Sequence, residues 1–203
     1  MAFLCACGGE VESASLPKGC EEVQSPAPKH VDLKRPHRRV RPGRMLTAKV
    51  ETSCGSFEIA LDATDSPRTV SSFAYLARRG VYDDTTFHRI VPSFVIQGGD
   101  PLGTGSGGPG YSIDEPPPPR TEYTKGTVAM AKLAVEPPGR SGSQFFVVTA
   151  ADAGLPPNYA VLGKVSSGQG VVERIAQLGD PRSGQRGTPR ATVVIRKVTI
   201  GGS

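Results

Sequence analysis

The sequence predicts a mainly β protein, a closed eight-stranded antiparallel barrel capped at its ends by two α-helices. Three observations support this fold class. Gly and Pro account for 25 and 19 of the 203 residues, a content that favours many turns and little helix. Several short segments alternate apolar and polar residues with a period of two, as half-buried strands do. Only two segments carry apolar residues at the spacing of an amphipathic helix.

The chain divides at about residue 45. Residues 46–203 hold the strand and helix patterns and predict one domain, whereas residues 1–45 predict a leader and a basic, proline-rich linker. The segment 29–44 carries seven Lys and Arg against one Asp, a net charge of +6, so the rest of the chain sums to −1 (+5 minus +6). Such an arm could contact nucleic acid or anionic lipid. Its prolines and its lack of Phe, Tyr and Trp favour a solvated linker with no specific nucleic-acid partner.

The first half of the domain predicts a hairpin and a helix. Segments 46–52 and 56–61 alternate on either side of a turn. A helix then begins at Ser66-Pro67, with Ser66 as its N-cap, and ends at Arg78-Arg79-Gly80. Its apolar residues fall on one stripe, so we assign this helix to core packing and expect no chemistry from it.

The second half of the domain predicts the remaining strands and one more helix. Alternation from Thr86 to Gln97 breaks at Pro92-Ser93, which indicates two short strands because proline cannot donate to a strand ladder. A helix is expected over residues 170–178. Further segments have the composition of strands, and they cover residues 127–132, 143–149, 159–165 and 190–200.

The N-terminal residues suggest a lipid anchor. Leu4-Cys5-Ala6-Cys7 has the form Leu-x-Ala-Cys and resembles the lipobox of bacterial lipoproteins, with Cys7 as the acylated residue. The apolar run before it is shorter than a signal sequence requires. Two explanations stay open: a start codon upstream of Met1, which the small polar residues after Cys7 favour, or a chance match. The first implies an extracytoplasmic lipoprotein or secreted protein with its N-terminal lipid in the membrane, and the second a cytoplasmic protein.

Cys20 and Cys54 have two interpretations. As a disulfide they would pin the N-terminal tail to the first hairpin and indicate an oxidising, extracytoplasmic compartment. As unpaired thiols they would indicate nothing about the compartment. The four cysteines, at positions 5, 7, 20 and 54, lack the paired CxxC spacing of a zinc site.

Other chemistries lack the residues that they need. Histidine occurs only at positions 30, 37 and 88, and no serine lies in a GxSxG motif, so a hydrolase triad is not indicated. No HExxH motif indicates a metal. The glycine-rich segment 103–110 is not followed by Gly-Lys-Ser/Thr, so it predicts a flexible loop and not a phosphate site. No metal and no cofactor are therefore predicted.

One segment, residues 87–100, organises the expected site. Its sequence is Phe-His-Arg-Ile-Val-Pro-Ser-Phe-Val-Ile-Gln-Gly-Gly-Asp, which brings the cation of Arg89, the ring of Phe94 and the amide of Gln97 close together without a nucleophile. The segment resembles the signature of the cyclophilin-type peptidyl-prolyl cis–trans isomerases. The second signature of that family resembles Met130-Ala131 followed by Gly-Ser-Gln-Phe-Phe at residues 142–146. The resemblance extends over about residues 47–200.

The resemblance implies a cyclophilin-like barrel that isomerises X–Pro bonds. It makes Arg89 the central catalytic residue and gives Gln97 the task of positioning the backbone carbonyl at the prolyl bond. The other site residues that it implies are the proline-ring pocket of Phe94, Met130, Phe146 and Leu155, the backbone contacts of Ala131 and Lys132, the groove-lining Gln144, and Tyr159, where many relatives carry histidine.

This reaction needs no proton transfer. Rotation about the X–Pro bond is slow because it breaks amide resonance, with a barrier of ~18–20 kcal/mol. A rigid, permanently charged guanidinium can favour the twisted amide over the planar one. Proline-containing peptides and unfolded proteins are the expected partners of a monomeric enzyme. A proline-binding chaperone or scaffold with incidental catalysis is the alternative, and the presence of Arg89 together with Gln97 favours the enzyme. Gly154 falls where animal members carry a tryptophan used in cyclosporin binding, so weak sensitivity to cyclosporin is expected.

Overall fold

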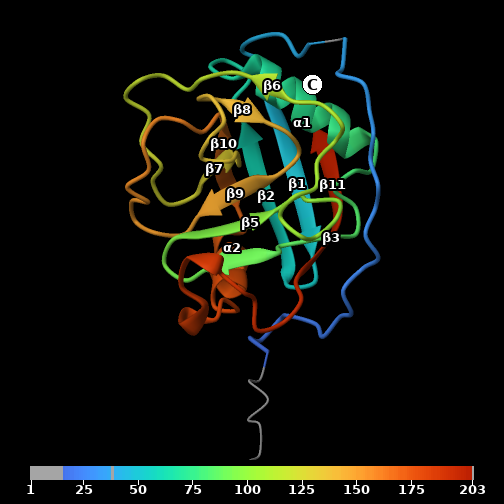
Figure 1. Cartoon of the computed structure of the whole chain (residues 1–203), viewed down its shortest axis with the longest axis vertical. Helices are drawn as coiled ribbons and strands as arrows, with labels where there is room; N and C mark the ends of the chain where they lie inside the picture. Colours follow the sequence, from blue (N-terminus) through green and yellow to red (C-terminus); the bar gives the residue numbers. More distant parts are fainter. Residues whose placement is uncertain (1–15, 38, 203) are drawn as a thin grey trace, which may run out of the picture.

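The computed structural model describes residues 16–37 and 39–202 of the chain (Figure 1). The predicted lipidation residue, Cys7, lies outside the described residues. Within them, a curled antiparallel sheet surrounds the core, with helix α1 (Pro67–Arg78) at one end and helix α2 (Gln169–Ala176) at the other. Neither these helices nor any other helix in the described ranges is long and apolar enough to cross a membrane.

The main sheet has nine antiparallel strands in the spatial order β3-β11-β1-β2-β10-β7-β9-β5-β4. Its two edge strands, β3 and β4, are consecutive in the chain. A bridge between Thr86 of the edge strand β3 and Asp100, which follows β5, links the two ends of the curled sheet. The strands are β1 Leu46–Thr52, β2 Gly55–Leu61, β3 Thr85–Thr86, β4 Arg89–Val91, β5 Val95–Gly98, β7 Thr127–Met130, β9 Phe145–Val148, β10 Val161–Ser167 and β11 Val194–Gly201. The predicted mainly β barrel with two helices is confirmed.

The strand count differs from the predicted eight. Besides the nine strands of the main sheet, β6 (Ile113–Asp114) and β8 (Arg140–Ser141) form a separate two-stranded sheet. The additional strands β3, β6 and β8 contain two residues each, and two residues are too few to show an alternating pattern. The closing strand starts at Val194 and not at residue 190, because residues 190–193 form no strand ladder.

Buried aromatic side chains fix the backbone on which the site stands. Phe73 of α1 packs against Tyr82 with ring centroids 4.7 Å apart, and Phe145 of β9 meets Phe87 edge-on at 6.1 Å. All four side chains are at most 1% exposed. Burial of each such ring removes a large apolar area from water, which stabilises the fold by about several kcal/mol. The aromatic cluster therefore ties α1 and β9 to the residues that precede β4.

Helix α1 is capped from a distant part of the chain. Ser66 occupies the N-cap position, as predicted, but its side chain makes no capping hydrogen bond. The carboxylate of Glu115 accepts hydrogen bonds from the backbone N–H groups of Arg68 at 3.0 Å and Thr69 at 2.6 Å. A negative charge at this end also complements the helix dipole.

Replacing Glu115 with glutamine should therefore destabilise the protein. Glu115→Gln keeps the shape of the side chain and removes its charge, so we expect the free energy of unfolding to fall by about 1 kcal/mol. Urea unfolding measures the change, with Glu122→Gln, an exposed carboxylate, as the matched control. Equal effects of the two substitutions would mean that Glu115 does not cap the helix.

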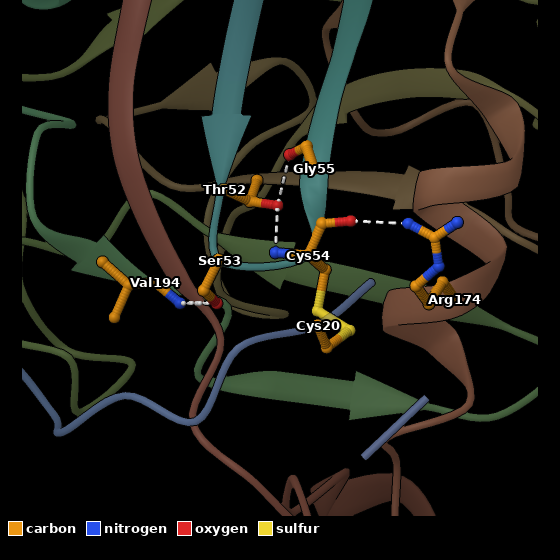
Figure 2. The surroundings of a disulfide bond; sticks show 7 residues. All are labelled: Cys20, Thr52, Ser53, Cys54, Gly55, Arg174 and Val194. Atoms are coloured by element: carbon orange, nitrogen blue, oxygen red, sulfur yellow. Dashed lines mark hydrogen bonds between the residues drawn. A yellow bond between two sulfur atoms is a disulfide. The ribbon is translucent and has the colours of Figure 1, made fainter. Parts of the chain in front are cut away.

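The N-terminal segment lies against the barrel. Residues 16–37 and 39–44, which we call the strap, run along its outside (Figure 1). A disulfide joins Cys20 of the strap to Cys54, in the turn between β1 and β2, which is the first of the two interpretations of these cysteines. Figure 2 shows the bonds that tie this turn to distant parts of the chain: the guanidinium of Arg174 donates to the carbonyl of Cys54 at 2.7 Å, and the Val194 N–H donates to the Ser53 hydroxyl at 3.1 Å.

The strap continues in contact with the barrel beyond the disulfide. The N–H of Lys29 donates to the carbonyl of Pro101 and that of Leu33 to the carbonyl of Pro109, both at 2.8 Å. Further along, the N–H of Val40 donates to the hydroxyl of Ser71 on α1 at 2.7 Å. The composition of residues 29–44 predicts a solvated linker, whereas the structure shows a segment attached to the barrel. The bonds above are made by backbone donors, which no sequence pattern marks.

Candidate active site

The hairpin of β4 and β5 places the central residues of the site. Arg89 and Gln97 are directly opposite each other in the antiparallel register, so both side chains project from the same face. The turn between the strands contains Ser93 at φ 55°, and Phe94 follows it immediately. The guanidinium carbon of Arg89 lies 5.9 Å from the centre of the Phe94 ring. The structure thus brings together the three residues that the sequence singles out in this segment.

The guanidinium of Arg89 is held on two sides. Its Nη1 donates to Oε1 of Gln97 at 3.2 Å, while Nε and Nη2 donate to the backbone and side-chain oxygens of Gln185 at 3.0 and 3.3 Å. Gln185 lies in a 3₁₀-helix (Pro181–Arg186), and no sequence pattern identifies it as a partner. Burial lowers the pKa of Arg89, and nearby Tyr159 partly offsets that effect. The group stays cationic, because arginine starts from a pKa above 12.

A chain of amides extends from Arg89 across the groove. Nε2 of Gln97 donates to Oε1 of Gln144 at 3.1 Å, and Nε2 of Gln144 donates to the carbonyls of Gly105 and Gly107, each at 2.9 Å. The glycine-rich loop is therefore attached to the site through one side chain. Gln144 lines the groove, as predicted, and also connects the loop to Gln97.

An apolar cluster lies beside the guanidinium. Phe146 and Tyr159 meet edge-on with ring centroids 5.4 Å apart, and Tyr123 completes the aromatic group. Half-exposed Phe94 and Leu155 pack against it, so three of the four predicted pocket residues come together. The full cluster consists of buried Val95, Tyr123, Ala129, Phe146 and Val148 with partly buried Phe94, Ala131, Ala150, Ala153, Leu155, Tyr159 and Val161.

Met130 is not part of this cluster, and its predicted place in the pocket wall is wrong. Its side chain is 1% exposed and packs in the main core together with that of Val128. The reason is strand geometry: successive side chains of β7 point to opposite faces, so Ala129 faces the apolar cluster and its two neighbours face the barrel interior. Val95, which the sequence analysis did not assign, lies in the cluster, on the same face of β5 as Gln97.

Ala131 and Lys132 line a groove of about 360 Å³ together with Gln97, Gln144 and the glycine-rich loop. The N–H of Ala131 is already used, since it donates to the carbonyl of Gln144 at 2.9 Å. The Lys132 ammonium donates to the carbonyl of Glu136 at 2.8 Å and lies 5.6 Å from the centre of the Tyr159 ring. Of the backbone groups of these two predicted residues, the Ala131 N–H is therefore not available to a substrate.

His88, next to Arg89, is not placed to act as a base on a substrate, because both of its ring nitrogens are buried. Burial lowers its pKa, and the opposing effect of nearby Asp100 is smaller. Its neutral form is therefore favoured in the folded protein at neutral pH, and its place beside the glycine-rich loop is structural.

The lowered pKa of His88 gives a stability prediction with a definite sign. The unfolded chain takes up a proton at His88 below about pH 6.5, whereas the folded chain resists it, so stability should fall as the pH decreases from about 6.5 toward 5. Urea midpoints at the two ends of this window measure the effect. In His88→Gln the decrease should be smaller; an identical decrease in both proteins would contradict the assignment.

Among the described residues, no group of three or more His, Cys, Asp or Glu side chains could hold a metal ion. What the site offers is a fixed cation with N–H donors, an apolar aromatic cluster beside it, and a groove bounded by backbone. Such an arrangement can hold a ring and polarise an amide, and its geometry supplies no activated nucleophile.

Comparisons with known proteins point to one family. The model of the cyclophilin type peptidyl-prolyl cis-trans isomerase family matches residues 47–200. A peptidyl-prolyl cis-trans isomerase-like 1 of Gibberella zeae is 38% identical over 155 residues, which cover 74% of this chain and 92% of that protein. A probable peptidyl-prolyl cis-trans isomerase B of Mycobacterium tuberculosis is 34% identical over 93% of this chain and 66% of its own. A solved cyclophilin-type isomerase of Cryptosporidium parvum has a TM-score of 0.70 at 28% identity, covering 78% of this chain and 99% of that one.

Proposed function

The chain belongs to the cyclophilin-type peptidyl-prolyl cis–trans isomerases, and we propose that Arg89, Gln97 and the apolar cluster around Phe146 carry out the isomerisation of X–Pro bonds. The proline ring enters the apolar cluster beside Phe94 and Leu155. Gln97 holds the carbonyl that precedes the proline. The guanidinium of Arg89 then lies next to the amide that must twist.

The energetic requirement is preferential stabilisation of the twisted amide. As the C–N bond rotates, the nitrogen becomes pyramidal and regains a lone pair, which a hydrogen-bond donor stabilises more than it stabilises the planar form. The donors of Arg89 are fixed before the substrate arrives, so little reorganisation is needed during the rotation. The apolar surroundings strengthen the same interaction by excluding water.

One observation carries this proposal: the guanidinium of Arg89 is fixed and yet incompletely used. Arginine has five N–H groups in a rigid fork. Three atoms, Nε, Nη1 and Nη2, each donate one bond to Gln97 or Gln185. In the described part of the chain this leaves two N–H groups of Arg89 for a ligand. A guanidinium that the protein already holds in place and that keeps free donors can bind a ligand with little reorganisation.

The test is exchange NMR on a short neutral peptide with one Ala-Pro bond. Catalytic amounts of the protein should produce cis–trans exchange cross-peaks at a rate far above that of the peptide alone. Shifted peptide resonances without faster exchange would identify a proline-binding module and contradict the proposed mechanism. The choice of peptide follows a similar solved isomerase of Cryptosporidium parvum, 28% identical, whose structure was determined in the presence of the dipeptide Ala-Pro.

We also propose an extracytoplasmic location, with unfolded or proline-containing chains as substrates. Support comes from the Cys20–Cys54 disulfide, because such bonds persist in oxidising compartments. Alkylation of whole cells, followed by mass spectrometry of the strap peptide, distinguishes the alternatives. Cys20 modified in intact cells without prior reduction would contradict an oxidising compartment.

Weak binding of cyclosporin is expected for this version of the site. Gly154 stands where the family resemblance places a tryptophan in animal members, and open space surrounds the position of a side chain there. Loss of a large aromatic contact should weaken the inhibitor by a few kcal/mol, while isomerisation is less affected. A direct calorimetric titration measures the affinity. Nanomolar binding would contradict this expectation.

A further inference from the structure

A second groove lies between the strap and helix α1. It has a volume of about 660 Å³, and we call it the basic groove. Ser71, Tyr75 and Arg78 of α1 form one wall. The other wall consists of the strap residues Lys34, Arg35, Pro36, His37, Arg39, Val40 and Arg44 together with Leu46 of β1. The cations that line it are Lys34, Arg35, Arg39, Arg44 and Arg78, all of them exposed. A smaller adjoining hollow shares Arg35 and Arg39 and adds Arg68.

The charge of the basic groove is only partly offset by its surroundings, through the longer-range effect of Asp114 on Arg35. Among the described residues, none of its lining cations forms a salt bridge, and no carboxylate lines it. The nearby acidic residues are engaged elsewhere. Asp114 pairs with Arg140 at 2.8 Å, and Glu115 caps helix α1. A single-sign groove attracts an oppositely charged ligand and concentrates it locally.

The shape and floor of the basic groove indicate which kind of anion fits. Partly buried Val40 and Tyr75 lie among the cations, so a ligand with apolar atoms between its charges is accommodated better than a small inorganic ion. Among the described residues, Tyr75 and the imidazole of His37 are the only aromatic rings of its lining. Single-stranded nucleic acid relies on several stacking rings, so an acidic polypeptide is the better match.

The basic groove is close to the substrate groove. Tyr111 and Ser112 line the substrate groove, and the next residue, Ile113, lines the smaller basic hollow. Nη2 of Arg35 donates to the carbonyl of Ser112 at 2.6 Å, and the hydroxyl of Ser72 on α1 contacts that of Tyr111 at 2.9 Å. A chain leaving the substrate groove over this segment therefore meets the cations of the basic groove.

We propose that the basic groove is an extended subsite for acidic stretches of the substrate, so that the enzyme prefers proline bonds in chains that carry Glu or Asp clusters nearby. This inference rests on the proposed isomerase site and names its substrate class. The strap supplies four of the five cations of the basic groove, which gives this segment a part in specificity.

The experiment compares two peptides that differ only in charge. Each contains one Ala-Pro bond and a flexible Gly-Ser spacer that leads to three Glu or to three Gln residues. The three Glu or Gln residues are placed before the proline in one set of peptides and after it in another, with several spacer lengths. The two sets cover both directions in which the peptide chain can run from the substrate groove to the basic groove. We expect kcat/KM for the best acidic peptide to exceed that of its Gln counterpart about fivefold at low ionic strength, as several exposed charge pairs together would give.

The matched variants separate the basic groove from general charge. Arg39→Gln/Arg44→Gln removes two exposed cations of the groove for which no hydrogen bond of the side chain to a described residue is found. Lys164→Gln/Lys197→Gln removes two exposed cations that line neither groove. The acidic-to-neutral ratio should fall toward one in the first variant and persist in the second. Salt near 1 M should abolish the preference of the wild type for the acidic peptide, since the screening length is then about 3 Å.

Several outcomes would overturn the inference. One is an acidic-to-neutral ratio of kcat/KM that is the same in wild type and in the Arg39/Arg44 variant. Another is a ratio that falls as far in the Lys164/Lys197 control as in the Arg39/Arg44 variant. Binding of single-stranded RNA or of anionic vesicles that depends on Arg39 and Arg44, without discrimination between the peptides, would assign the basic groove to another partner. Failure to isomerise the neutral peptides would instead contradict the proposed function, so the two failures are distinguishable.

Discussion

Replacing Arg89 with alanine is expected to lower kcat/KM for a neutral Ala-Pro peptide by about 10²–10³-fold, the usual effect of removing a preorganised electrostatic donor. The variant loses the cation beside Phe94 and the only guanidinium bonded to Gln97 in the described structure. Folding should be little affected, because the side chain is half-exposed and its bonds to Gln185 lie at the surface. Exchange NMR gives the rate, and circular dichroism checks the fold.

Two further arginine variants sharpen this result. Arg89→Lys keeps a charge but loses the rigid fork, so it should recover only part of the rate. Arg182→Ala removes an exposed arginine paired with Asp180 in the same region and should leave the rate unchanged. An accelerated rate in Arg89→Ala equal to that of wild type would contradict the catalytic role of Arg89.

Reduction of the Cys20–Cys54 disulfide is expected to lower the free energy of unfolding by about 3–4 kcal/mol, the loop-closure value for the 34-residue separation of the two cysteines. The effect arises mainly in the unfolded chain, which gains freedom when the loop opens. The folded chain also loses the anchor at the start of the strap. Urea unfolding with and without dithiothreitol measures the difference.

The double variant Cys20→Ser/Cys54→Ala provides the control. It should match the reduced wild type in stability and show no further change with dithiothreitol. Coincident unfolding curves for oxidised and reduced wild type would show that the strap contributes nothing to stability through its covalent link.

The parts of the fold that depend on local patterns could be predicted from the sequence. The β1–β2 hairpin follows from alternation, and helix α1 begins at Pro67 as its position predicts. The two-residue strands could not be predicted, because they exist through pairing with distant segments. The cap of α1 was missed for the same reason: Glu115 reaches the helix from 46 residues further along the chain.

The site divides in a similar way. Arg89, Phe94 and Gln97 lie within one hairpin, where strand alternation alone places them together. Met130 was misplaced because the motif gives its position in the chain but not its face of β7. Gln185 lies 96 residues from Arg89, and no pattern connects the two. The composition of the strap predicts a linker because its bonds, from backbone and side-chain donors alike, reach residues far along the chain, such as Pro101 and Ser112, which no local pattern marks.

The pH dependence of the isomerisation rate tests the central claim, electrostatic catalysis without proton transfer, most directly. The measurement is kcat/KM for a neutral Ala-Pro peptide between about pH 6.5 and 9, where the Arg89 guanidinium stays charged. We expect a flat profile, because no catalytic group gains or loses a proton in that range. A profile that titrates with the pKa of an acid or a base would contradict it and indicate proton transfer in the rate-limiting step.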